Sequence, residues 1–145
     1  MTRGAVHGDG GGTSGGGGMG AAAESFDPGD TGRLRNALGR FATGVTVITA
    51  RSFDGAPIGF TANSFNSVSL DPPLILWSLA RSSERLGAYR AAEAYAVNIL
   101  STEQAPVARR FASRVENRFD GVEWREGVGG APVLSGSLAV FECSH

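Results

Sequence analysis

Hydrophobic and polar positions divide the chain into short runs that predict strands more often than helices. The β-branched run Val45–Ala50 predicts a strand, and the Asp54-Gly55 pair is typical of a turn between antiparallel strands. We therefore expect a returning strand over Ile58–Ala62. Further strands are predicted over Tyr95–Leu100 and, from its alternation, over Ser137–Cys143.

Three other stretches are read from composition. Asn63–Pro73 is polar and rich in turn-forming residues, so we expect a loop there. Leu74–Leu79 is nearly all apolar, which predicts a strand buried on both faces. Residues 115–136 contain several glycines and are expected to be irregular.

Short helices are predicted at three places. Apolar residues at helical spacing favour one over 32–42, and another is expected over 84–90. Ser101 and Gln104 match a capping box that opens a third helix, which carries Phe111 inward. Because strands dominate and do not alternate with long helices, the pattern favours a small antiparallel barrel with peripheral helices over a doubly wound parallel sheet.

Composition separates the two ends of the chain. Residues 1–32 hold 12 of the 22 glycines and few large apolar side chains. Such a segment cannot bury enough surface to offset its conformational entropy. We interpret residues 1–32 as a flexible tail and residues 33–145 as the folded domain.

Charge and cysteine content narrow the function. The formal net charge is −1, which favours neither nucleic acid nor an anionic membrane as a partner. Cys143 is the one cysteine, so neither an intrachain disulfide nor a multi-cysteine metal site is expected. No apolar run approaches the ~20 residues of a membrane span. We expect a cytoplasmic protein without a metal.

Candidate chemistry gathers in one polar stretch, Gly59–Pro73. Its hydroxyls, amide and main-chain donors suit a planar polar ring edge or a phosphate, although a plain connecting loop has the same composition. Ser82 and Ser83 precede the helix predicted over 84–90, where free N–H groups favour an anion. An ordinary N-cap is the alternative for this pair.

Several segments then match one family in the same order. They include the runs Thr61-Ala62-Asn63-Ser64-Phe65 and Ser67-Val68-Ser69-Leu70-Asp71-Pro72-Pro73, and the further segments 40–49, 81–83, 96–100, 109–112, 118–122 and 131–134. This series resembles the flavin reductase family of FMN-binding split barrels, the reductase components of two-component flavin-dependent monooxygenases. The resemblance implies a mainly β fold, an antiparallel split barrel with peripheral helices.

The resemblance also implies function. It predicts an NAD(P)H-dependent flavin reductase that binds FMN or FAD, uses NADH or NADPH, forms a homodimer and passes reduced flavin to a partner monooxygenase. The chemistry would belong to the flavin, so no catalytic acid or base is expected. The residues that the resemblance assigns to the flavin are Thr43, Gly44, Val45, Thr46, Thr61, Ala62, Asn63, Ser64, Ser67, Val68, Ser69, Ser82 and Ser83.

One departure from the family pattern concerns the last predicted strand. The family domain continues beyond the strand that matches Ser137–Cys143, with a turn that often holds a Gly-Asp-His motif and a closing strand. The domain over 33–145 is therefore expected to lack its C-terminal strands: the sequence is a fragment, its missing strands come from elsewhere, or the product is impaired. As it stands, we expect it to bind flavin poorly and to turn over NAD(P)H slowly or not at all. Two alternatives stay open: a pyridoxamine-phosphate-oxidase-like oxidoreductase, and a flavin-binding protein without turnover.

Overall fold

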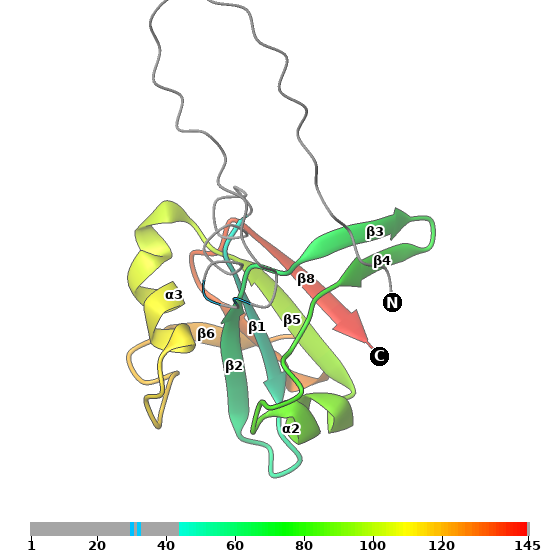
Figure 1. Ribbon diagram of the computed structural model, residues 1–145. Helices are drawn as coiled ribbons and strands as arrows, with labels where there is room; N and C mark the ends of the chain where they lie inside the picture. The colour runs from blue at the N-terminus through cyan, green and yellow to red at the C-terminus, as the bar shows by residue number, and fades with distance from the viewer. Residues whose placement is uncertain (1–29, 31, 33–43, 145) are drawn as a thin grey trace, which may run out of the picture. The chain divides into compact units, whose positions relative to one another are not determined.

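An antiparallel sheet of four strands organises the protein. A computed structural model describes residues 30, 32 and 44–144, and Figure 1 shows the strands side by side in the order β2-β1-β5-β8. Their bounds are β1 Thr46–Arg51, β2 Pro57–Ala62, β5 Ala94–Ile99 and β8 Ala139–Ser144. The four strands predicted from alternation and β-branching are thus confirmed to within two residues at each end.

Smaller elements surround this sheet. Two further sheets have two strands each, β3 Asn66–Leu70 with β4 Pro73–Leu76, and β6 Trp124–Glu126 with β7 Pro132–Leu134. The α-helices are α2 Leu86–Ala91 and α3 Ala105–Ala112, and short 3-10 turns are η1 Thr102–Gln104 and η2 Val128–Gly130. The predicted tail over 1–32 and helix over 32–42 fall outside the described residues, apart from positions 30 and 32.

Burial explains why β1 holds the centre of the sheet. Its residues from 46 to 50 are all buried. Ile48 packs on one face in a cluster with Tyr89 of α2, and Val47 packs on the other face in a cluster with Phe111 of α3. A strand covered on both faces needs a continuous run of apolar or hydrogen-bonded residues, which is what this sequence provides.

The β1–β2 turn confirms the Asp54-Gly55 signal. Gly55 has a φ of 80°, a left-handed conformation that glycine adopts without steric cost. The Asp54 carboxylate accepts hydrogen bonds from the Ser52 hydroxyl and the Ala56 amide. These two bonds, the first above all, hold the pKa of Asp54 below its usual range.

Three predictions about the remaining chain are wrong. The stretch 63–73 is not simply a loop, because it contains β3 and the start of β4. Leu74–Leu79 is not a strand buried on both faces: β4 ends at Leu76, and Leu74 and Leu76 are exposed. The stretch 115–136 is not wholly irregular, because it contains β6, η2 and β7.

Helix boundaries agree more closely with expectation. The Ser101–Gln104 capping box is present, with the Ser101 amide donating to Gln104 Oε1 at 3.1 Å, and it opens η1, which continues into α3. Helix α2 begins at Leu86, two residues later than predicted. Among the described residues, the α-helices have six and eight residues, far fewer than the ~20 that cross a bilayer.

The barrel prediction is correct in its coarser part. Residues 44–144 are mainly antiparallel β with few helices, as expected. Within that range, however, the strands form three separate sheets rather than one closed barrel. Strand β8 pairs with β5 along one edge, and β2 forms the opposite edge of the four-stranded sheet.

Candidate functional site

Two of the predicted segments meet at one end of the central sheet. Thr46 opens β1 and lies directly opposite Ala62, the last residue of β2. Gly44 and Val45 therefore enter the sheet beside the point where Asn63 leaves it. Thr43 lies outside the described residues. Figure 1 shows the chain leaving this end of β2 toward the β3–β4 hairpin.

The two threonines at this end use their hydroxyls within the protein. Thr46 is buried, and its Oγ1 donates to the carbonyl oxygen of Ala62 at 2.8 Å. Thr61 Oγ1 donates to the carbonyl oxygen of Ala108 in α3 at 2.6 Å. These bonds tie β2 to β1 and to α3. Any ligand at this end would therefore be met by main-chain groups more than by these two hydroxyls.

Ser64 makes a paired contact with a second segment. Its Oγ accepts a hydrogen bond from the Ser78 amide at 3.1 Å and lies 3.4 Å from the Ser78 carbonyl oxygen, to which it donates. The hydroxyl thus bridges the chain after β2 to the chain after β4.

The β3–β4 hairpin carries the next three predicted residues. Ser67 pairs with Ile75 in the ladder, and a bulge between Ser67 and Ser69 turns Val68 outward, where its side chain is 60% exposed. Ser69 Oγ donates to the Asp71 carbonyl oxygen at 3.1 Å. A bulge displaces main-chain groups from regular pairing, so this irregular stretch is available for a different interaction.

The Ser82-Ser83 pair lies in the turn before α2. The Ser83 amide donates to the Ala80 carbonyl oxygen at 2.9 Å, and Ser83 Oγ accepts from the Arg85 amide at 3.3 Å. The hydroxyl of Ser83 thus stabilises the approach to the helix, while Ser82 is exposed. Contact of either serine with a phosphate stays a prediction.

An arginine pair that the sequence reading missed fixes the loop beside β2. Arg118 is 9% exposed, and it donates to the carbonyl oxygens of Gly59 and Ser113. Burial lowers the pKa of its guanidinium, and the charge of Arg85 lowers it further. Arg110 in turn donates to the Arg118 carbonyl oxygen at 2.9 Å, which ties α3 to the same loop.

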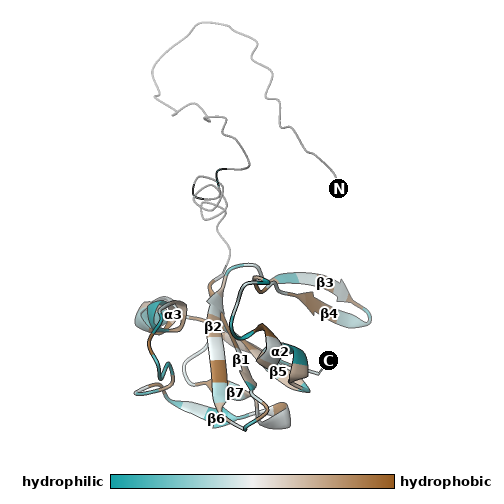
Figure 2. Ribbon diagram, turned by 60° about the horizontal axis from the view of Figure 1, so that its bottom comes forward, coloured by the Kyte–Doolittle hydropathy of each residue, from teal (hydrophilic) through white to brown (hydrophobic). Residues whose placement is uncertain are grey.

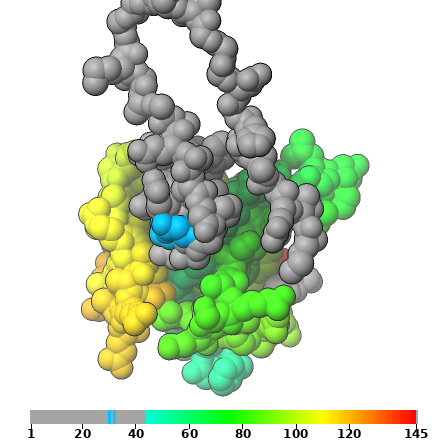
Figure 3. All heavy atoms as spheres, in the orientation of Figure 1, coloured from blue at the N-terminus to red at the C-terminus, as the bar shows by residue number. Residues whose placement is uncertain are grey.

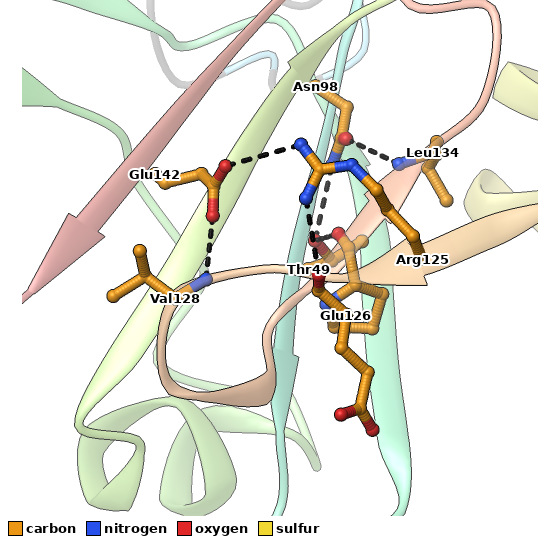
Figure 4. Close-up of polar contacts among 8 residues, drawn as sticks. Thr49, Asn98, Arg125, Glu126, Val128, Leu134 and Glu142 are labelled. Atoms are coloured by element: carbon orange, nitrogen blue, oxygen red, sulfur yellow. Dashed lines mark hydrogen bonds and ion pairs between the residues drawn. The ribbon is translucent and has the colours of Figure 1, made fainter.

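A buried polar network joins β7 to the central sheet, as Figure 4 shows. Asn98 Nδ2 donates to Thr49 Oγ1 and to the Val47 carbonyl oxygen, each at 3.1 Å. Asn98 Oδ1 accepts from the Leu134 amide at 2.8 Å, and Thr49 Oγ1 donates to the Pro132 carbonyl oxygen. Every polar atom of the Asn98 side chain therefore has a partner.

A second contact in Figure 4 holds β8. The Glu142 carboxylate accepts from the Val128 amide at 2.6 Å and lies 3.5 Å from Arg125 Nη2. Cys143, next along β8, is partly covered, and burial raises the pKa of its thiol. A raised pKa disfavours the reactive thiolate.

The two tryptophans lie against the hydrophobic clusters. Trp77, expected in the core, is half-buried and packs edge-on against Tyr89 and Tyr95, with ring centroids 5.5 and 5.3 Å apart. Trp124 is half-buried beside Phe119. The guanidinium carbon of Arg51 lies over the Trp124 ring, 5.1 Å from the ring centroid.

The predicted residues contain no carboxylate, imidazole or thiol, so they include no general acid or base, and no base of their own that would activate their hydroxyls as nucleophiles. They instead provide amides, hydroxyls and main-chain groups held by internal hydrogen bonds. Such a set can bind and orient a polar ring system that brings its own reactivity. The arrangement therefore fits a redox cofactor site more closely than a hydrolytic one.

Comparisons with known proteins agree with this interpretation. The family model described as "Flavin reductase like domain" matches residues 38–145. The FMN reductase (NADH) SmoA of Agrobacterium fabrum is 52% identical over 110 residues, covering 76% of this chain and 62% of SmoA. The flavin-dependent monooxygenase reductase subunit HsaB of Rhodococcus jostii is 43% identical over 123 residues, covering 85% of this chain and 61% of HsaB.

Solved structures give the same result. The NADH:FAD oxidoreductase SgcE6 of Streptomyces globisporus, solved with NAD and FAD fragments, superposes with a TM-score of 0.77 at 41% identity, covering 84% of this chain and 73% of SgcE6. The chain spans less than two thirds of the length of the two curated relatives named above.

Proposed function

Because this chain belongs to the flavin reductase-like family, we propose that it is an NAD(P)H:flavin oxidoreductase that supplies reduced flavin to a partner monooxygenase. The observation that carries the proposal is the meeting of residues 44–46 and 61–64 at one end of the central sheet. The relatives named for NADH-dependent flavin reduction support the reaction class.

The polar stretches at this end would hold FMN or FAD. The Thr46 hydroxyl holds the Ala62 carbonyl oxygen where the segments 44–46 and 62–64 meet, and the bulge between Ser67 and Ser69 offers further main-chain groups. A flavin held there would supply the hydride-accepting chemistry that a reaction with a nicotinamide requires. The protein's own part is to bind the ring, orient it and limit access of water.

The first test is steady-state oxidation of NADH and NADPH with added FMN or FAD. We expect flavin-dependent oxidation of at least one nicotinamide, because relatives named for NADH-dependent flavin reduction are 52% and 41% identical to this chain. Flavin binding without oxidation would instead favour a non-catalytic flavin-binding protein. Turnover of a pyridoxamine phosphate, with no nicotinamide oxidation, would favour an oxidase of that type.

The three sheets are proposed to be parts of one split barrel. Strand β7 is attached to the central sheet through the Leu134–Asn98 and Thr49–Pro132 hydrogen bonds. The β3–β4 pair continues from β2 through a short connection. A cytoplasmic location belongs to the same proposal, since Cys143 is the one cysteine and forms no intrachain disulfide.

A homodimer is proposed to form through the β3–β4 hairpin. The hairpin projects from the rest of the described chain as a separate lobe (Figure 3), and Figure 2 shows the hydrophobic character of β4. Val68, Leu70, Leu74 and Leu76 are 60%, 90%, 50% and 54% exposed. An isolated two-stranded hairpin is marginally stable, and clustered exposed apolar side chains mark an interaction surface.

Placing charge on this hairpin tests the dimer. The double substitution Leu74→Glu and Leu76→Glu, two positions on one face of β4, should shift the protein from dimer to monomer in sedimentation velocity at micromolar concentration, because it places carboxylates in a desolvated interface. Phe53→Glu is the matched control, since Phe53 is 88% exposed on the β1–β2 turn. A wild-type monomer with bound flavin, or dissociation by the control alone, would contradict the proposal.

A further inference from the structure

We propose that Ser64 is a positioning residue for flavin binding, whose hydroxyl closes the root of the β3–β4 hairpin instead of contacting the flavin. This inference rests on the proposed function and deepens it. It assigns to Ser64 a role different from the direct polar contact that the family resemblance predicts.

The register of the hairpin supports the assignment. The backbone ladder of β3 and β4 begins at the pair Asn66 and Leu76. If the same register continued two residues before Asn66 and two residues after Leu76, it would place Ser64 opposite Ser78. The backbone ladder does not extend there, and the Ser64 hydroxyl joins those positions instead, bonding both the amide and the carbonyl of Ser78. One side chain thus replaces a backbone pair.

The hydroxyl has little capacity left for a flavin. A serine hydroxyl carries one proton and two acceptor lone pairs. In Ser64 the hydroxyl oxygen lies 3.4 Å from the Ser78 carbonyl oxygen, to which it donates, and one lone pair accepts the Ser78 amide. Donating to a flavin would require breaking the first of these bonds, so Ser64 is better suited to hold Ser78 in place.

The bridge joins the two halves of the proposed site. Asn63 lies directly before Ser64, and Ser78 leads to the turn that contains Ser82 and Ser83. Packing at the same root supports it, because Phe65 stacks on Phe141 of β8 with ring centroids 5.5 Å apart. Loss of the hydroxyl would let the two segments move apart while the aromatic contact keeps the hairpin attached.

The test measures flavin affinity and amide exchange in the same variants. In Ser64→Ala, the Ser78 amide of the flavin-free protein should exchange faster with solvent, and the dissociation constants of FMN and FAD should rise about fivefold, as expected for one lost neutral hydrogen bond. Ser64→Thr retains the hydroxyl and should restore both properties. If the alanine variant does not fold, Ser64→Cys takes its place. Its thiol is a weaker hydrogen-bonding group, so Ser78 exchange and the flavin dissociation constants should rise by less than in Ser64→Ala.

Ser52→Ala is the matched control. The Ser52 hydroxyl also bonds a main-chain oxygen in a turn, that of Ala56 at 3.2 Å, on the β1–β2 hairpin. Its removal should leave flavin affinity and Ser78 exchange unchanged. Unchanged Ser78 exchange in Ser64→Ala, or faster exchange with unchanged flavin affinity, would overturn the inference. A wild-type protein that binds neither FMN nor FAD would instead overturn the proposed function.

Discussion

Replacing Gly59 with valine should destabilise the protein by about 3 kcal/mol, the upper range for overpacking a filled core. Gly59 lies in β2 and is buried against α3. A Cβ atom at this position would lie 2.5 and 2.8 Å from two ring atoms of Phe111 and 3.4 Å from Phe119. Real side chains do not approach so closely, so either the ring or the strand must move.

Neither can move without loss of other contacts. Phe111 is fully buried and packs edge-on against Phe119, with ring centroids 4.9 Å apart. The Gly59 carbonyl oxygen accepts from Arg118 at 2.9 Å, and the neighbouring Thr61 hydroxyl holds α3. Displacing α3 would therefore break hydrogen bonds at the proposed flavin-binding end of β2. We expect flavin affinity to fall together with the melting temperature.

Gly87→Ala provides the control, because it adds a Cβ atom to a glycine at a position where the structure has room for one. No atom lies within 4 Å of a Cβ built at Gly87, which belongs to α2. Alanine there should be neutral or stabilise by up to about 1 kcal/mol through helix propensity. Urea unfolding of the three proteins gives the comparison. Equal midpoints for Gly59→Val and wild type would show that α3 does not pack on β2 as described.

The strands that the sequence predicted correctly are those whose local residue pattern agrees with their burial in the folded protein. β1, β2, β5 and β8 carry β-branched or alternating residues and pair within one sheet, so local pattern and tertiary burial agree. Strand β3 was missed because its polar residues resemble a loop. Strand β4 was expected to be buried and to run to Leu79 because its residues are nearly all apolar. Alternation over Asn66–Leu70 was the available signal.

The candidate site shows a similar division. Motif order placed Thr46 and Ala62 in the same site, and the register confirms that they are neighbours. The partners of the hydroxyls could not be predicted, because Thr61 bonds α3 across 47 residues and Ser64 bonds a segment 14 residues away. Such contacts depend on the packing of distant elements, which spacing in one sequence does not encode.

Replacing Asn98 with leucine should also destabilise the protein by about 3 kcal/mol, because it leaves buried polar groups without partners. Asn98 is fully buried in β5. Leucine has a similar volume but removes the acceptor of the Leu134 amide and the donor to Thr49, both visible in Figure 4. It also removes the donor to the Val47 carbonyl oxygen. Since the Leu134 bond attaches β7 to the central sheet, we expect β6 and β7 to lose protection from hydrogen exchange first.

Asn98→Asp separates the loss of hydrogen bonds from the burial of charge. The carboxylate keeps an acceptor for the Leu134 amide, but burial should raise its pKa in the folded state. A raised folded pKa means that stability falls as pH rises above the unfolded value of about 4.

Asn117→Ala is the control, since Asn117 is exposed and bonds one amide, that of Phe119 at 3.2 Å. It should cost about 1 kcal/mol or less, without pH dependence. If Asn98→Asp were as stable as wild type at pH 7, this position would be open to water and the buried network of Figure 4 would not be what attaches β7.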